Sequence, residues 1–144
     1  YITLLTNIKI NKLARYIIPI NSGICTQMNS VSITDKSSSD QNTLEFSKFT
    51  GYKILPLTLN DLIFRIPKGN NIAIKIDVEG LEEDVILSGK NSLLNRKEVK
   101  LIYVEILDDN ISKIGSILNE YGFECIRHKP NKKSNYVNNV YRKI

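Results

Sequence analysis

The chain has 144 residues, of which 42% are hydrophobic and 24% are charged, and its net charge is +5. This length supports one hydrophobic core rather than two, and the composition is that of a globular domain. Neither an apolar run of the roughly 20 residues that a membrane-spanning helix needs nor a signal peptide is found, so a cytoplasmic location is expected.

The first part of the chain alternates regular and irregular segments. Apolar residues at helical spacing predict a helix over residues 1–13. A short apolar run predicts a strand over Tyr16–Ile20, which ends at the turn Asn21-Ser22-Gly23. The polar stretch over about residues 26–50 is expected to be an irregular excursion, with brief strands on either side of its most polar part, residues 34–42.

The middle of the chain carries clearer signals. Tyr52–Leu57 has the pattern of a strand, and Pro56 places it at a sheet edge or marks its end. Thr58, followed three residues later by Asp61, predicts the N-terminal cap of a short helix. Ile72–Asp77 is a nearly uninterrupted apolar strand, of the kind that is buried on both faces of a parallel sheet.

The last part continues the alternation. A helix over Leu81–Leu87 begins with three acidic residues, which suit the positive end of its dipole. A second buried strand is predicted over Val99–Val104, and a helix over Asp109–Tyr121 ends at a glycine. Two final strands, Phe123–Ile126 and Tyr136–Tyr141, form a hairpin. The order predicts an α/β domain with a mainly parallel sheet, helices on both faces and an antiparallel C-terminal edge.

Cysteine, histidine and basic residues give weak functional signals. Cys25 and Cys125 are far apart in the chain and only His128 is close to one of them, so buried structural thiols are favoured over a zinc site. Basic residues gather after position 126, where contact with phosphate groups is one interpretation and a solvated surface is the favoured one. Nucleic acid is not expected as a partner, and the oligomeric state cannot be read from the sequence.

Acidic side chains follow the two most apolar strands. Asp77 and Glu79 stand at the end of one strand, next to Gly80, and Glu105 ends the other. Ligands of open α/β sheets bind beyond the carboxyl ends of the strands, where carboxylates can accept hydrogen bonds, act as a base or ligate a metal. For Asp77 and Glu79 a purely structural role as helix caps is equally favoured, and nothing in the sequence argues for a metal.

A third polar group, Asn21-Ser22-Gly23, follows the first predicted strand. Its short side chains and accessible backbone could contact a purine ring, although the same residues also make an ordinary turn.

Several of these motifs, in this order, resemble the signature of FkbM-type methyltransferases. The resemblance rests on Ile74–Glu82, on Val85–Gly89 and on Leu101–Ile106, and Leu57–Leu62 is similar to a further family segment in which Asn60 replaces an aspartate. It implies a Rossmann-like domain that transfers a methyl group from S-adenosylmethionine to a hydroxyl group of a sugar, glycan or natural product.

The resemblance also implies roles for individual residues. Asn21, Ser22 and Gly23 would lie near the adenine of the cofactor. Asp77 would face the methionine part of the cofactor or the acceptor, with Glu79 close by, and Glu105 would line the acceptor side. Asp77 or Glu79 is therefore expected to hold or deprotonate the acceptor hydroxyl, with Glu105 as a lesser candidate.

The glycine-rich loop and the ribose-binding acid of the family have no counterpart among these residues. Residues 1–144 are therefore expected to be one partial methyltransferase domain without its first two strands, which alone binds the cofactor poorly and is inactive. The alternatives are a non-catalytic remnant that acts as an interaction module, and a metal-dependent nucleotide-sugar enzyme.

Overall fold

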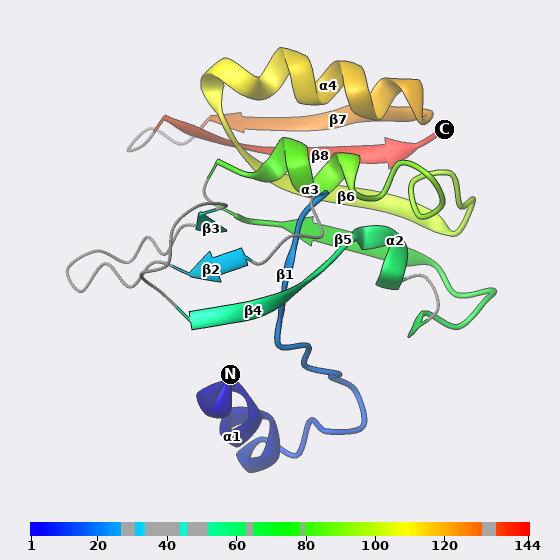
Figure 1. Cartoon of the computed structure of the whole chain (residues 1–144). Helices are drawn as coiled ribbons and strands as arrows, with labels where there is room; N and C mark the ends of the chain where they lie inside the picture. Colours follow the sequence, from blue (N-terminus) through cyan, green and yellow to red (C-terminus); the bar gives the residue numbers. More distant parts are fainter. Residues whose placement is uncertain (27–30, 34–43, 46–51, 63–64, 79, 131–134) are drawn as a thin grey trace.

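The computed structural model describes residues 1–26, 31–33, 44–45, 52–62, 65–78, 80–130 and 135–144. Figure 1 shows the helices and strands, which in chain order are α1 (Ile2–Ile10), β1 (Ser22–Ile24), β2 (Val31–Ile33), β3 (Leu44–Glu45), β4 (Tyr52–Leu57), α2 (Leu59–Leu62), β5 (Ile72–Ile76), α3 (Glu82–Leu87), β6 (Val99–Leu107), the 3₁₀ turn η2 (Asp108–Asn110), α4 (Ile111–Glu120), β7 (Phe123–Pro130) and β8 (Tyr136–Lys143).

The strands form two four-stranded sheets, with the orders β1-β4-β2-β3 and β5-β6-β8-β7. Strands β1 and β4 are parallel, as are β5 and β6, whereas the other pairings between described strands are antiparallel. The predicted α/β class and the antiparallel C-terminal edge are therefore confirmed. A mainly parallel sheet is not, because the excursion supplies β2 as an antiparallel neighbour of β4 and β3 as an antiparallel neighbour of β2, and because the final hairpin places β8 between β6 and β7.

The second sheet buries one of its faces. On β6, Ile102, Val104 and Ile106 are fully buried, whereas Tyr103 and Glu105, which point the other way, stay partly exposed. This alternation follows from the period of two of an extended strand. The hydrophobic core therefore lies on the side of Ile102, and the opposite face of the sheet remains accessible.

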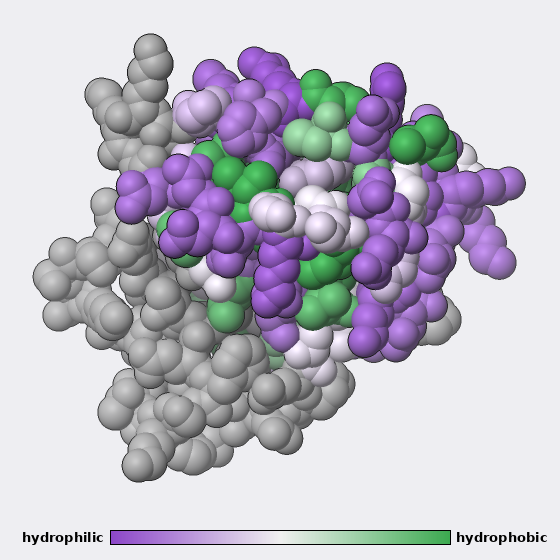
Figure 2. All heavy atoms as spheres, turned by 90° about the horizontal axis from the view of Figure 1, so that it is seen from above, coloured by the Kyte–Doolittle hydropathy of each residue, from purple (hydrophilic) through white to green (hydrophobic). Residues whose placement is uncertain are grey.

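Helices α3 and α4 pack on the buried face (Figure 1). The Lys113 ammonium of α4 lies 2.7 Å from the Glu83 carboxylate of α3, so the two helices are neighbours. Ile114 and Leu118 of α4 are fully buried, and its outer side is mostly hydrophilic when the molecule is viewed from α4 and β7 (Figure 2). Helices on both faces of this sheet, which the sequence predicts, are not confirmed.

The strand predicted over Tyr16–Ile20 is wrong. The amides of Tyr16 and Ile17 both bond to the Leu13 carbonyl in a turn, and Ile18 is 72% exposed. The strand lies later, over the residues that were expected to form the turn, and Gly23 of β1 stands opposite Pro56 of β4. Local apolarity predicted a strand at a place where none of the described strands pairs with it.

Several local predictions are confirmed. The Asp61 amide donates to the Thr58 hydroxyl at 3.1 Å, and the Thr58 amide donates to the Asp61 carboxylate at 2.7 Å, which is the expected reciprocal cap of α2. Pro56 is the penultimate residue of β4 and so marks the end of this strand, but β4 is not at a sheet edge, because it pairs with both β1 and β2. Gly122, with φ +77°, follows α4 as its stop, because a side chain is strained in that conformation. The segment 34–42 lies outside the described residues.

One prediction about the cysteines needs correction. Cys25 is fully buried, as expected, but Cys125 is exposed on β7, an edge strand of the second sheet. Of the basic residues after position 126, Arg127 and Lys129 lie on β7 and Arg142 and Lys143 on β8. Lys143 donates to the Leu94 carbonyl at 2.5 Å and stacks over the Phe123 ring. Among the helices that the structure describes, none is long and apolar enough to cross a membrane.

Candidate functional site

Two of the predicted acids come together at the carboxyl ends of neighbouring strands. Strands β5 and β6 are parallel with Ile76 opposite Val104, so the next residues, Asp77 and Glu105, stand side by side. The two carboxyl groups share a hydrogen bond, which helps to keep the pKa of Asp77 low. The strand-end rule that motivated these candidates therefore places them at one point of the sheet edge.

Lys75 completes this group. It lies two positions before Asp77, so both side chains emerge on the face of the sheet opposite α3 and α4. The Lys75 ammonium donates to the Asp77 carboxylate at 2.6 Å and lies 5.9 Å from the centre of the Tyr103 ring. The side chains of Lys75 and Asp77 are 65% and 41% exposed, so solvent and ligands can reach the pair.

The charge state of the site follows from these contacts. The hydrogen bond from Lys75 is the main reason why the pKa of Asp77 is lowered; burial opposes this effect and the hydrogen bond with Glu105 supports it. Conversely, the hydrogen bond and the charge of Asp77 raise the pKa of Lys75. At neutral pH Asp77 is therefore an ionised hydrogen-bond acceptor.

The polar surface continues onto β8. Tyr103 stands opposite Val140, and Glu105 stands opposite Asn138, so Asn138 shares the accessible face with both β6 side chains. The Tyr103 hydroxyl donates to the Asn138 amide oxygen. The bond fixes the tyrosine next to Lys75, and the five side chains on β5, β6 and β8 line one continuous polar strip.

The turn after Asp77 is held by a buried carboxylate. Glu79, the third predicted acid, lies outside the described residues. Gly80 has φ +89°, and its amide donates to the Glu82 carboxylate at 2.7 Å. Glu82 is only 1% exposed at the beginning of α3, so it fixes the backbone that leads from the strand into the helix.

The residues that were predicted to contact the adenine do not lie beside the acidic pair. Ser22 and Gly23 line a cavity of about 530 Å³ between β1 and β5, together with Ile24, Ile74, Lys75 and Val78, and most of its other lining is aliphatic. Asn21 is exposed and does not line it. Asp77 does not line it either, although its neighbours Lys75 and Val78 do. Ser22 and Gly23 belong to β1 itself, and not to a turn behind a strand as expected.

Thr26, which follows the carboxyl end of β1, contacts α3 instead of the acidic pair. The amide of Thr26 donates to the Asp84 carboxylate at 2.9 Å, and its hydroxyl donates to the other oxygen of the same carboxylate. Asp84 thus ties β1 to the first turn of α3. The sequence explained this acid by the helix dipole alone.

Other polar residues of the resembling segments are structural. The Asn60 amide oxygen accepts from the amides of Ser92 and Leu93, both at 3.0 Å, and from the Ser92 hydroxyl. It therefore fixes the turn after α3 and does not reach the acidic pair. Among the described residues, no group of three or more His, Cys, Asp or Glu side chains is arranged to hold a metal ion.

Sequence reasoning missed Lys75, Tyr103 and Asn138 as members of the site. Lys75 and Tyr103 could have been found, because alternation along a strand places positions 75 and 77, and 103 and 105, on the same face. Asn138 carries no such signal, since its position depends on the antiparallel register of β8 with β6.

Comparison with known proteins gives one result for the chain. The family model of the methyltransferase FkbM domain matches residues 1–125, which include both parallel strands of the acidic site and end within β7. Searches of curated proteins and of solved structures give no match.

Proposed function

Because the chain belongs to the FkbM methyltransferase family, we propose that it serves in the transfer of a methyl group from S-adenosylmethionine to a hydroxyl group of a sugar, glycan or natural product. The observation that carries the proposal is the pair Asp77 and Glu105, at the ends of the two parallel strands within the matched segment. The accessible polar side chains around this pair can exchange hydrogen bonds with a hydroxylated acceptor.

The described residues fit only part of the cofactor. The mainly aliphatic cavity beside Ser22 and Gly23 suits a flat purine ring, and the Asp77 carboxylate suits a positively charged amino group. No acidic side chain lines the described part of the cavity, so no carboxylate there accepts hydrogen bonds from ribose hydroxyls. We therefore propose that these residues alone bind the cofactor weakly, and we assign no step through it.

The described residues of this chain bind, orient and deprotonate the acceptor hydroxyl. S-adenosylmethionine, when bound, supplies an electrophilic methyl group. Asp77 holds the acceptor hydroxyl by accepting its hydrogen bond, which orients the oxygen. The proton of a hydroxyl group becomes strongly acidic once its oxygen is methylated. A carboxylate with a lowered pKa is therefore still basic enough to take this proton. Glu105 is the second carboxylate within reach, and Lys75 keeps Asp77 ionised.

Cofactor binding tests the first part of the proposal. Calorimetric titration of the whole chain with S-adenosylhomocysteine should show weak binding, which Asp77→Asn weakens further and the distant exposed change Asp109→Asn leaves unchanged. Tight binding would contradict the partial fit. The metal-dependent alternative predicts binding of a nucleotide-sugar that requires Mg²⁺ or Mn²⁺, and the same calorimeter can test it with uridine diphosphate glucose.

A further inference from the structure

A second cavity lies on the other side of the sheet. It has a volume of about 430 Å³, lies between α4 and the strands β7 and β8, and is open to solvent. Val104 and Ile102, which stand opposite Asn139 and Tyr141, belong to the buried face, whereas Glu105 and Asp77 belong to the accessible face. The second cavity is therefore separated from the acidic pair by the sheet itself, and β8 lies beyond the residues that the family model matches.

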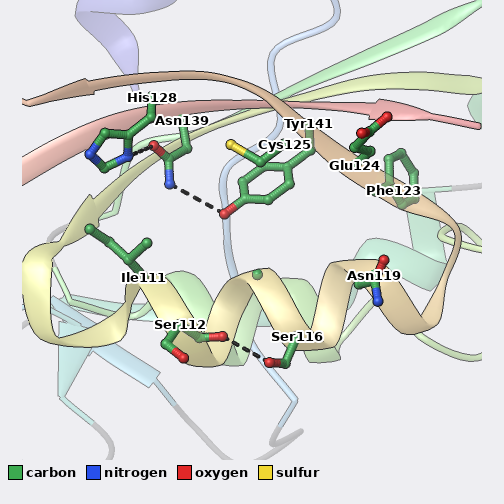
Figure 3. Close-up of a pocket in the computed structure, with 11 residues that line it drawn as sticks. Ile111, Ser112, Ser116, Asn119, Phe123, Glu124, Cys125, His128, Asn139 and Tyr141 are labelled. Carbon is green, nitrogen blue, oxygen red and sulfur yellow. Dashed lines mark hydrogen bonds between the residues drawn. The ribbon is translucent and has the colours of Figure 1, made fainter.

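A chain of hydrogen-bonded polar side chains, of which Asn139 and Tyr141 are buried and His128 is exposed, forms the wall of this cavity (Figure 3). The Asn139 amide nitrogen donates to the Tyr141 hydroxyl at 3.3 Å, so its amide oxygen, 2.9 Å from His128 Nδ1, is the acceptor of the second bond. His128 must therefore carry a hydrogen on Nδ1, which leaves Nε2 as an acceptor in the neutral ring. Asn139 and Tyr141 are 1% and 2% exposed, so the arrangement is fixed by packing.

The Tyr141 hydroxyl has a hydrogen to donate. Its oxygen accepts from Asn139, and no acceptor for its own hydrogen is found among the residues that the structure describes. Burial raises the pKa of the phenol, so the hydroxyl keeps this hydrogen at neutral pH. A buried donor without an acceptor is costly, by about 1–3 kcal/mol, unless water or a ligand satisfies it.

Space for a ligand is left opposite this hydroxyl. Gly115 of α4 faces Tyr141, and a Cβ atom at this position would lie 3.7 Å from the hydroxyl oxygen. Any larger side chain would therefore enter the cavity. The volume falls within the range of about 300–1,000 Å³ that small-molecule sites occupy.

The lining defines the class of ligand. Its described residues include no lysine or arginine, and Glu124 is the one carboxylate, so an anion such as a phosphate is disfavoured. Aromatic and aliphatic surface from Phe123, Tyr141 and Ile111 lies beside the hydroxyl, amide and imidazole groups. A ligand with an apolar face and several hydroxyls, each both donor and acceptor, matches this mixture.

We propose that the cavity between α4 and the β7–β8 hairpin binds a neutral hydroxylated molecule of monosaccharide size, which accepts a hydrogen bond from Tyr141 and donates one to His128. The site does not depend on the proposed methyl transfer, because it uses none of the residues near Asp77. It would hold a sugar on the face of the sheet opposite the acidic pair.

Nuclear magnetic resonance titration of the whole ¹⁵N-labelled chain tests the proposal. The probes are methyl glucoside, methyl galactoside and N-acetylglucosamine, with glucuronate as the anionic counterpart. We expect at least one neutral sugar to cause saturable shifts of amides in α4, β7 and β8, with a Kd of millimolar order, and glucuronate to bind more weakly. Absence of saturation at about 50 mM for all three, or a preference for glucuronate, would overturn it.

Two variants locate the site. Tyr141→Phe keeps the ring but removes the hydroxyl and should weaken binding about tenfold, and Gly115→Leu should abolish it by filling the cavity. Tyr16→Phe removes an exposed hydroxyl in the N-terminal segment, which lines neither cavity, and is the matched control that should bind like the wild type. Thermal unfolding checks that each variant is folded. If Gly115→Leu does not fold, Tyr141→Phe decides, and wild-type affinity in that variant contradicts the proposed site.

Discussion

The Lys75 ammonium and the Asp77 carboxylate, two positions apart at the end of β5, lie 2.6 Å apart on the sheet face opposite α3 and α4. This contact is the main reason for the low pKa of Asp77. It therefore sets the ionisation of the residue on which the proposed chemistry depends.

Replacing Lys75 by glutamine should raise the pKa of Asp77 towards the ordinary aspartate value of about 3.9. The reason is that the positive charge, and with it the charge-assisted hydrogen bond, is lost. Carbon-13 NMR of the Asp77 carboxyl group during an acid titration measures the change. Lys68→Gln, at an exposed lysine of the loop before β5, is the control and should leave the pKa of Asp77 as it is. An equal Asp77 pKa in both variants would show that Lys75 does not determine it.

The reciprocal cap formed by Thr58 and Asp61 should contribute to stability in a pH-dependent way. The Thr58 amide and then its hydroxyl lower the pKa of Asp61, so the stabilisation is present above the pKa of the unfolded chain and is lost as the pH falls through the folded value. Thr58→Ala should lower the free energy of unfolding by about 1 kcal/mol at pH 7.

Urea unfolding at pH 7 and at about pH 3 tests this cap. The difference between wild type and Thr58→Ala should shrink at the lower pH, because the stabilisation by ionised Asp61 declines once the pH is below the aspartate pKa of the unfolded chain. Ser112→Ala, at an exposed serine of the first turn of α4, serves as the control. A Thr58→Ala effect that is the same at both pH values would mean that the Asp61 charge has no part in the cap.

The cap shows which features could be predicted from the sequence. Thr58 and Asp61 satisfy each other within one turn, and Gly122 stops a helix that immediately precedes it, so neighbours in the chain contain the whole signal. Asp77 was likewise predicted to end a strand from its neighbours in the chain, because it directly follows an apolar run. These features need no knowledge of the rest of the fold.

The predictions that were wrong or missing concern residues whose positions depend on distant parts of the chain. Tyr16–Ile20 is as apolar as a strand but pairs with none of the strands that the structure describes, whereas Ser22–Ile24 becomes a strand only because β4 lies beside it. Asn138 enters the acidic site, and Asn139 the second cavity, through the register of β8 with distant strands. Contacts between residues far apart in the sequence decided these positions, and a single sequence does not reveal them.

Two glycines near α4 should respond oppositely to alanine. Gly122 has φ +77°, where a Cβ atom is strained, so Gly122→Ala should lower the free energy of unfolding by about 1 kcal/mol. Gly115 lies inside the helix, and its added Cβ would make an ordinary contact at 3.7 Å with Tyr141, so Gly115→Ala should raise stability by up to about 1 kcal/mol. Chemical unfolding measures both, and shifts of the same sign would contradict this account of α4.

The buried face of β6 should carry much of the stability. Ile106 is fully buried among core residues, so Ile106→Ala should cost about 2–5 kcal/mol. Ile126 of β7 is 46% exposed, and Ile126→Ala is the matched control, with a much smaller expected loss. Guanidinium unfolding compares the two variants. Similar losses at both positions would be inconsistent with a core on one face of the sheet.

The most direct test of the proposed function is transfer of tritium from S-adenosyl-[methyl-³H]methionine to a panel of hydroxylated acceptors by the full gene product that carries residues 1–144. Wild type is compared with Asp77→Asn and with Asp109→Asn, which removes an exposed acid in η2. We predict that Asp77→Asn lowers turnover about 100-fold or more with an unchanged melting temperature, while Asp109→Asn retains wild-type turnover. Wild-type turnover in Asp77→Asn would contradict the role of the strand-end acids, and no transfer by any variant would favour a non-catalytic remnant.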